Sequence, residues 1–141
     1  MPDGVNGYYK YAGDVEISGN LTTAQDLNIL IDDKLPKGFA NHVTFADNDS
    51  VTLKFPEAQD VSLVWVYPTT VTSYNTASVS ILVNGKYLYK DVKFPSAGGA
   101  AVVSLDKLPD GTMVSDITLS FAKAEDSECS AIGEVIFTLN K

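Results

Sequence analysis

The sequence contains no arginine and only one cysteine, one histidine and one tryptophan, and the shortages of arginine, cysteine and histidine each argue against a class of function. All ten basic residues are lysines, scattered singly among 18 acidic residues, and the net charge is −8. Nucleic acids and anionic membranes require clustered cations, and carboxylates or phosphates are usually recognised by the bidentate arginine fork. The composition therefore disfavours nucleic acid and membrane as partners and favours a neutral one.

The shortage of cysteine and histidine also argues against catalysis. Cys129 cannot form an internal disulfide, and we expect it to be a small, partly buried side chain. With His42 as the only histidine, a metal site with two histidines is impossible, and no nucleophile motif lies near it. Walker and dinucleotide-binding motifs are missing. We predict that the protein is not an enzyme, although its many carboxylates leave a small hydrolase as an alternative.

Long apolar segments are missing too. No run approaches the roughly 20 residues that span a bilayer, and the start, Met1–Gly4, lacks the features of a signal peptide. The 141 residues fit one domain that can bury a core without disulfides. We expect residues 1–141 to be a single module, excised from an exported, extracellular protein. The alternative is that the native protein does not use the signal-peptide route of export.

Short segments with the two-residue periodicity of β-strands dominate the sequence, and turn residues separate them. Asn84-Gly85 supplies the two positive-φ positions of a type I′ hairpin turn. This pattern predicts an all-β sandwich or barrel. The predicted strands are Val15–Ile17, Val43–Phe45, Ser50–Phe55, Val61–Tyr67, Ala77–Val83, Lys86–Phe94, Ala100–Leu105, Ile117–Phe121 and Ile132–Leu139.

Helix signals are sparse, and the central strand carries the only tryptophan. Thr22–Leu27 can begin a single helical turn, with Thr22 or Thr23 as its cap. Val61–Tyr67 is the most apolar segment and is predicted to be a central strand that ends at Pro68. Its alternation places Trp65 in the core or on a flank of the sheet rather than on a binding platform.

The C-terminal quarter combines two predicted strands with a polar loop. Ile117–Phe121 alternates apolar and polar residues, Lys123–Glu128 is a soluble loop, and Ala131–Phe137 re-enters as an apolar strand. That last strand contains a lone carboxylate, Glu134. A carboxylate in such a strand must be solvated, paired or bound to a metal.

This ending resembles the closing strands of galactose-binding-like (discoidin-like, jelly-roll) domains, which often end in a Ser/Gly-Glu-Val/Ile-aromatic run. The resemblance implies a jelly-roll β-sandwich of two antiparallel sheets. Many members are carbohydrate-binding modules of secreted glycoside hydrolases, and others bind cell surfaces or are structural domains. Further segments that resemble the family, in order, are Asn28–Asp33, Asp49–Phe55, Val61–Tyr67 and Val79–Val92.

The family often holds a structural calcium ion, and the resemblance implies where it would bind. Carried over to this chain, the candidate ligands are Asp32, Asp33 and Glu134, with backbone carbonyls completing the oxygen shell that Ca²⁺ prefers. The chain departs from the family pattern because Asp33 stands where the loop glycine is usual. The alternative is a solvated loop with Glu134 paired to a lysine or to backbone amides.

Sugar binding needs an aromatic face for the C–H side of a pyranose ring and polar groups for its hydroxyls. Tyr74 and Asn75 lie in the long polar connection after the central strand, and Asn41 and His42 lie in another predicted loop. We expect these four residues to bind a neutral glycan or polysaccharide through loops at one end of the sandwich. The alternative is that they only anchor loops of a structural or receptor-binding domain, such as an adhesion or virion decoration domain.

Overall fold

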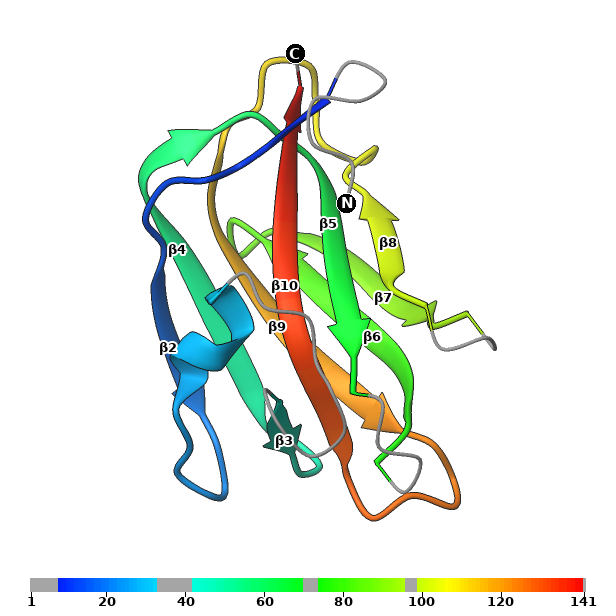
Figure 1. Ribbon diagram of the computed structural model, residues 1–141. Helices are drawn as coiled ribbons and strands as arrows, with labels where there is room; N and C mark the ends of the chain where they lie inside the picture. The colour runs from blue at the N-terminus through cyan, green and yellow to red at the C-terminus, as the bar shows by residue number, and fades with distance from the viewer. Residues whose placement is uncertain (1–7, 33–41, 70–73, 96–98, 141) are drawn as a thin grey trace.

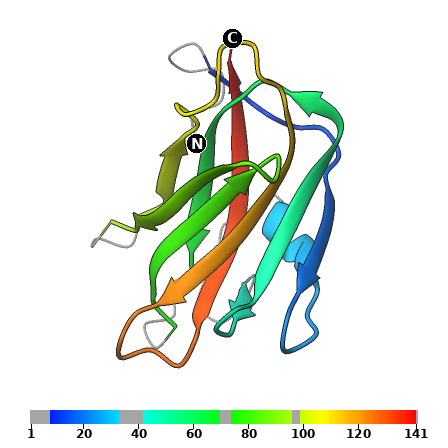
Figure 2. The ribbon, with the colours of Figure 1, turned by 180° about the vertical axis from the view of Figure 1, so that it is seen from behind.

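The computed structural model describes residues 8–32, 42–69, 74–95 and 99–140, and these form two five-stranded antiparallel sheets. The jelly-roll β-sandwich predicted from the sequence is therefore confirmed. Figure 1 shows the layer with β10 and β5 toward the viewer, and Figure 2 shows the layer with β9 and β6 from behind. The strands are β1 (Tyr8–Lys10), β2 (Glu16–Asn20), β3 (Val43–Phe45), β4 (Ser50–Gln59), β5 (Val61–Pro68), β6 (Thr76–Val83), β7 (Tyr87–Lys93), β8 (Ala101–Ser104), β9 (Val114–Lys123) and β10 (Ser130–Asn140).

The strand order places the last strand in the middle of its sheet. One sheet has the order β1-β10-β5-β8, with β3 also pairing with β10, and the other has the order β2-β4-β9-β6-β7. All nine predicted strands are present. The additional strand, β1, has only three residues and pairs with the end of β10. Its formation depends on a partner more than 120 positions away, which no local pattern reveals.

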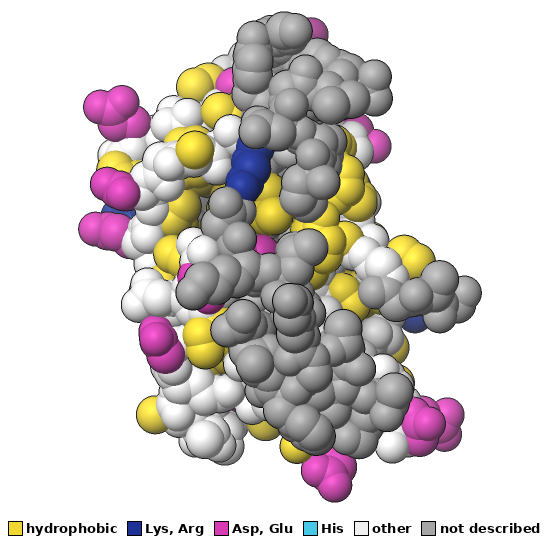
Figure 3. Space-filling view, in the orientation of Figure 1, with side chains coloured by type: hydrophobic (Ala, Val, Ile, Leu, Met, Phe, Trp, Pro, Cys, Tyr) yellow, Lys and Arg dark blue, Asp and Glu magenta, His cyan; other side chains and the backbone are white. Residues whose placement is uncertain are grey.

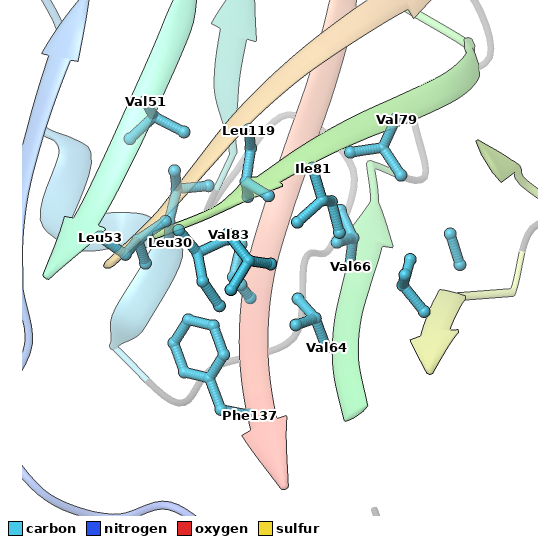
Figure 4. Packing of buried hydrophobic residues seen from close by; sticks show 14 of the residues in the cluster. Leu30, Val51, Leu53, Val64, Val66, Val79, Ile81, Val83, Leu119 and Phe137 are labelled. Atoms are coloured by element: carbon cyan, nitrogen blue, oxygen red, sulfur yellow. The ribbon is translucent and has the colours of Figure 1, made fainter. Parts of the chain in front are cut away.

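The core lies between the sheets because side chains alternate along each strand. In β4, Val51, Leu53 and Phe55 are buried, with exposed or half-buried residues between them. Val64 of β5 and Phe137 of β10 enter the same cluster from the opposite sheet. Figure 4 shows Val51, Leu53, Val64 and Phe137 among the buried side chains between the strands. Period-two alternation thus accounts for the layers and for the core.

The hairpin predicted at Asn84-Gly85 is confirmed. It joins β6 to β7, and both residues have positive φ, 55° and 66°. The Asn84 side chain also ties this turn to the start of β9: Nδ2 donates to the Met113 carbonyl (3.0 Å), and Oδ1 accepts from the Ser115 amide (2.7 Å). The turn is therefore held by tertiary contacts as well as by its own geometry.

The predicted helical turn begins later than expected. The helix η2 spans Leu27–Ile31, and its cap is Asp26, whose side chain accepts from the Asn28 amide (3.1 Å). Thr22 does not cap it, because its amide and hydroxyl both donate to Asp49. The prediction of a threonine cap was therefore wrong, since a distant carboxylate recruits that threonine. No helix among the described residues could span a membrane.

Strand β10 is buried on both of its sides. Val135 and Phe137 face the core, whereas Ile136 lies opposite Trp65 on the outer side and is still only 4% exposed. Trp65 is half-buried there, and its indole nitrogen donates to the Thr138 hydroxyl (3.4 Å). Trp65 therefore lies on a flank of the sheet, one of the two positions predicted for it. Figure 3 shows this face, with acidic side chains mainly at its rim.

Candidate functional site

Three segments far apart in the sequence meet at one end of the sandwich, the lower end in Figure 1. Their described parts are His42 just before β3, Thr69 and Tyr74–Asn75 of the connection between β5 and β6, and the loop between β9 and β10. They meet because β5 and β9 end there and β6 and β10 begin there, while the short strand β3 pairs with the first residues of β10. Loops at strand ends are where a rigid sandwich can place binding side chains.

His42 and Tyr74, both predicted as site residues, lie together at this end. Their rings meet edge to face, with centroids 6.0 Å apart and planes at 85°. Nδ1 of His42 is 3.1 Å from the Thr69 hydroxyl. Thr69 is itself buried, and its amide donates to the Ala131 carbonyl of β10 (3.0 Å). The imidazole is therefore oriented from the sheet through Thr69.

Asn75 lies beside Tyr74, with its backbone fixed and its side chain exposed. Its amide donates to the Ser127 hydroxyl (3.0 Å), and its carbonyl accepts from the Ala124 amide (2.9 Å). Ser127 is only 6% exposed, so a buried residue of the β9–β10 loop holds the Asn75 backbone. We call His42, Thr69, Tyr74, Asn75 and Ser127 the loop-end cluster.

The sequence analysis found three of these five residues and missed two. Thr69 and Ser127 are hydroxyl residues in polar loops, and nothing in their neighbours separates them from the other serines and threonines of the chain. Only their partners across the fold reveal a role. Asn41, the fourth predicted sugar-binding residue, lies outside the described residues.

The cluster offers chemistry suited to an uncharged, hydroxyl-rich ligand. It combines a half-exposed phenol ring, an imidazole and an exposed amide. The adjoining loop carries exposed carboxylates at Glu125, Asp126 and Glu128, which can accept hydrogen bonds but repel anions. This electrostatic setting agrees with the neutral partner that the composition favours.

Asp49 is a buried carboxylate at the same end of the sandwich, and its hydrogen bonds stabilise the fold. One oxygen accepts from the amide (3.0 Å) and hydroxyl (2.8 Å) of Thr22, and the other accepts from the Ala46 amide (2.8 Å). Burial acts to raise its pKa, but these hydrogen bonds to the charged form outweigh burial and leave the pKa lowered. Asp49 therefore ties the segment after β2 to the turn between β3 and β4.

One of the predicted metal ligands, Glu134, lies away from this cluster, at the outer side of β10. Glu134 is 2% exposed and lines a cavity of about 180 Å³ together with Lys10, Tyr11 and Ile31. Asp32 follows Ile31 as the C-cap of η2, and Asp33 lies outside the described residues. This cavity is separate from the loop-end cluster, since the two share no lining residue.

The described residues at this cavity do not by themselves fit a calcium ion. Ca²⁺ takes six to eight oxygen ligands, mostly from several carboxylates and carbonyls. Among the described residues no group of three acidic, histidine or cysteine side chains could hold a metal. A cation, Lys10, already lines the cavity with Glu134. The calcium site at Asp32, Asp33 and Glu134 stays a prediction.

Solved structures share this architecture over most of the length of this chain. A family 32 carbohydrate-binding module from Clostridium perfringens NanJ, in complex with galactose, matches with a TM-score of 0.65 at 16% identity, over 88% of this chain and 93% of that one. A CBM32-2 module of a GH31 protein, bound to GalNAc, matches with a TM-score of 0.62 at 16% identity, over 91% of this chain and 98% of that one. A family 89 glycoside hydrolase from Clostridium perfringens gives 0.64 at 10% identity, over 94% of this chain but only 14% of that one.

Identities this low establish the architecture and leave the ligand open. No protein-family model and no curated protein matches the sequence. The structural likeness nevertheless covers nearly the whole chain, both sheets included. The chain therefore has the discoidin-like, galactose-binding β-sandwich fold of the family 32 carbohydrate-binding modules.

Proposed function

We propose that this domain is a non-catalytic carbohydrate-binding module that binds a neutral glycan through the loop-end cluster. The observation that carries the proposal is the meeting of His42 with Tyr74 and Asn75, which come from a different segment of the chain. Thr69 orients the His42 imidazole, and the Ser127 hydroxyl accepts from the Asn75 backbone amide. A site that is held in place before binding loses little conformational entropy, which favours recognition by a small site.

Each side chain has its own part in the proposed binding mode. The Tyr74 ring packs against the C–H face of a pyranose. A tyrosine suits this role because its ring is apolar and its hydroxyl is polar. The Asn75 amide both donates to and accepts from sugar hydroxyls. Because Nδ1 of His42 faces Thr69, we assign its Nε2 to a sugar hydroxyl. Asn41, next to His42 in sequence, stays a predicted contact of the same ligand.

The choice of sugar follows from the structural neighbours. Two modules with this fold were solved with galactose and with GalNAc, so these sugars are the first ligands to test. A shallow site of this kind binds in roughly the micromolar to millimolar range, and a parent protein or assembly would add avidity. We propose that the domain is part of a larger exported protein. The family 89 glycoside hydrolase is an example of such an architecture, because the part that matches this chain is only 14% of its length.

The absence of catalysis is part of the proposal. Glycoside hydrolysis needs two carboxyl groups across the scissile bond, one of them usually in a desolvated setting. The described carboxylates next to the cluster, Glu125, Asp126 and Glu128, are all exposed on one loop. They suit hydrogen bonding to a ligand better than proton transfer.

The test is affinity electrophoresis of the domain against neutral polysaccharides, followed by calorimetry with galactose and GalNAc. We expect one polymer class to retard the domain and Asn75→Ala to weaken that retardation. The matched control is Asn28→Ala, an exposed asparagine of η2 outside the cluster. If no polymer retards the domain, the proposal fails and a structural or adhesion role replaces it.

A further inference from the structure

Glu134 is a buried carboxylate that lies outside the proposed sugar site. Its side chain is 2% exposed, and it lies in β10 between buried neighbours, from Ile132 to Thr138. An ionised carboxylate removed from water costs several kcal/mol unless a partner of opposite charge or several donors compensate it. The question is which group at the outer side of β10 has this role.

Strand geometry places Lys10 on the same side of the sheet as Glu134. Glu134, Ile136 and Thr138 alternate with the core residues Val135 and Phe137, so they share the outer side. In the β1–β10 ladder, Lys10 pairs with Thr138. Directly paired residues of neighbouring strands point to the same side. The Lys10 side chain is therefore on the outer side as well.

The cavity brings the two charges to one place. Lys10 and Glu134 both line the space of about 180 Å³, and Tyr11 and Ile31 form other parts of its wall. Lys10 is half-buried rather than fully solvated, and its long aliphatic stem can cover apolar surface while its ammonium reaches an acceptor. A half-buried cation beside a buried carboxylate has a stronger electrostatic interaction than a surface pair.

The electrostatic surroundings of Tyr67 agree with this placement of the two charges. Tyr67 of β5 is paired with Glu134 of β10. Burial raises the pKa of its phenol, the negative charge of Glu134 raises it further, and the positive charge of Lys10 opposes that rise. The two charges therefore act on the same side chain from within electrostatic range.

We propose that the ammonium of Lys10 is the counter-charge of Glu134, at the place where the family resemblance implies a calcium ion. The described donors at the cavity do not form a metal cluster, whereas β1 delivers a built-in cation. Lys10 then supplies the neutralising charge that a divalent ion would otherwise bring. It follows that β1 is an essential part of the domain. It also follows that the stability of the domain is independent of divalent cations.

The experiment measures the unfolding midpoint of the whole chain with EDTA and with added calcium. It does so for the wild type, Lys10→Met, Glu134→Gln and the double variant. Lys90→Met is the matched control, because Lys90 is an exposed lysine on β7, in the other sheet. We expect EDTA and calcium to leave the wild-type midpoint unchanged, and Lys10→Met to lower it by roughly 10 °C.

The double variant completes the test. If the two side chains interact, its midpoint falls by less than the sum of the two single effects. A wild-type midpoint that falls in EDTA and recovers with calcium would overturn the proposal in favour of a metal. Additive single effects, or a Lys10→Met effect no larger than that of Lys90→Met, would overturn it as well. The wild-type comparison decides the matter even if a variant does not fold.

Discussion

Two buried carboxylates, Asp49 and Glu134, show how differently two regions of this sandwich handle a charge. Asp49, at the loop end, accepts three hydrogen bonds from Thr22 and Ala46 in neighbouring turns. Glu134 lies in the part of β10 that pairs with β5 on one side, between the parts that pair with β3 and β1 on the other, and it shares a cavity with Lys10 of the N-terminal strand. Two amides and a hydroxyl thus stabilise the charge of Asp49, whereas for Glu134 we propose the ammonium of Lys10.

The same contrast applies to function. Strand β10 is the rigid centre of its sheet, and every residue from Ser130 to Thr138 is buried. The loop-end cluster is half-exposed and is held by hydrogen bonds from Thr69 and Ser127. We therefore expect substitutions in β10 to change stability first and substitutions in the cluster to change binding first. The predictions below test this separation.

The largest effect is expected at the centre of β10. Phe137 is 3% exposed and packs against the ring of Phe55 in the opposite sheet, with centroids 5.0 Å apart. Phe137→Ala removes this contact and leaves a cavity, so we expect a loss of about 3–5 kcal/mol in the free energy of unfolding. Urea denaturation measures it, with Leu88→Ala on the exposed side of β7 as the control. An equal loss in both variants would contradict the assigned core.

A smaller loss of stability is expected at the loop end. Asp49→Asn replaces one acceptor oxygen by a donor that cannot accept from the Ala46 or Thr22 amide, and we expect a loss of about 1–3 kcal/mol. Asp47→Asn, in the same turn but exposed, is the control and should have little effect. Urea denaturation at neutral pH compares the two variants.

The pH dependence of Asp49 sharpens this prediction. Because its folded-state pKa is lowered, the stabilisation by the carboxylate is present above the unfolded value of 3.8 and is lost as the pH falls through the lower, folded value. The stability difference between the wild type and Asp49→Asn should therefore shrink in acid. A difference that stays constant as the pH falls would mean that the charge of Asp49 is not the stabilising feature.

Tyr74→Ala is expected to change binding rather than stability. Tyr74 is half-exposed, and loss of its ring should weaken the affinity for the retained glycan by about 10-fold, the effect of removing one aromatic contact. Calorimetry measures this change. Tyr87→Ala, a half-buried tyrosine of β7 outside the cluster, is the control and should leave affinity unchanged. Intact affinity in Tyr74→Ala would contradict the proposed binding mode.

The smallest effect is expected from Thr69→Val, which keeps the shape of the side chain but removes the hydroxyl that faces His42. One lost hydrogen bond corresponds to about a 5-fold change in affinity. Thr118→Val is the matched control. The Thr118 hydroxyl bonds to Thr52, and both residues lie in the β2-β4-β9-β6-β7 sheet, outside the cluster. If both variants bind glycan equally well, Thr69 does not position His42 for binding.

Much of the fold was predictable because its information is local. Alternation along Ser50–Phe55 and Ile132–Leu139 identified strands, and Asn84-Gly85 identified a hairpin that the structure contains. The helical cap was predicted wrongly, since Thr22 is engaged by Asp49, 27 positions away. Local signals fail where a distant side chain competes for the same group.

The candidate site was predictable only in part, for the same reason. Tyr74 and His42 stand out by residue type in loops, and the structure places their rings together. Thr69 and Ser127 carry no local signal, because their roles arise from contacts made after the sheets have formed. Their hydrogen bonds join segments 27 and 52 positions apart in the sequence.

The sequence by itself determined the class of fold, and its composition favours a neutral partner. Period-two alternation requires strands with one buried side, and ten lysines scattered singly among 18 acids disfavour nucleic acid as a partner. Only the tertiary structure decided which side chains meet. Strand order and register bring His42 to Tyr74 and Lys10 to the cavity of Glu134, because pairing between distant strands sets distances that no local pattern encodes.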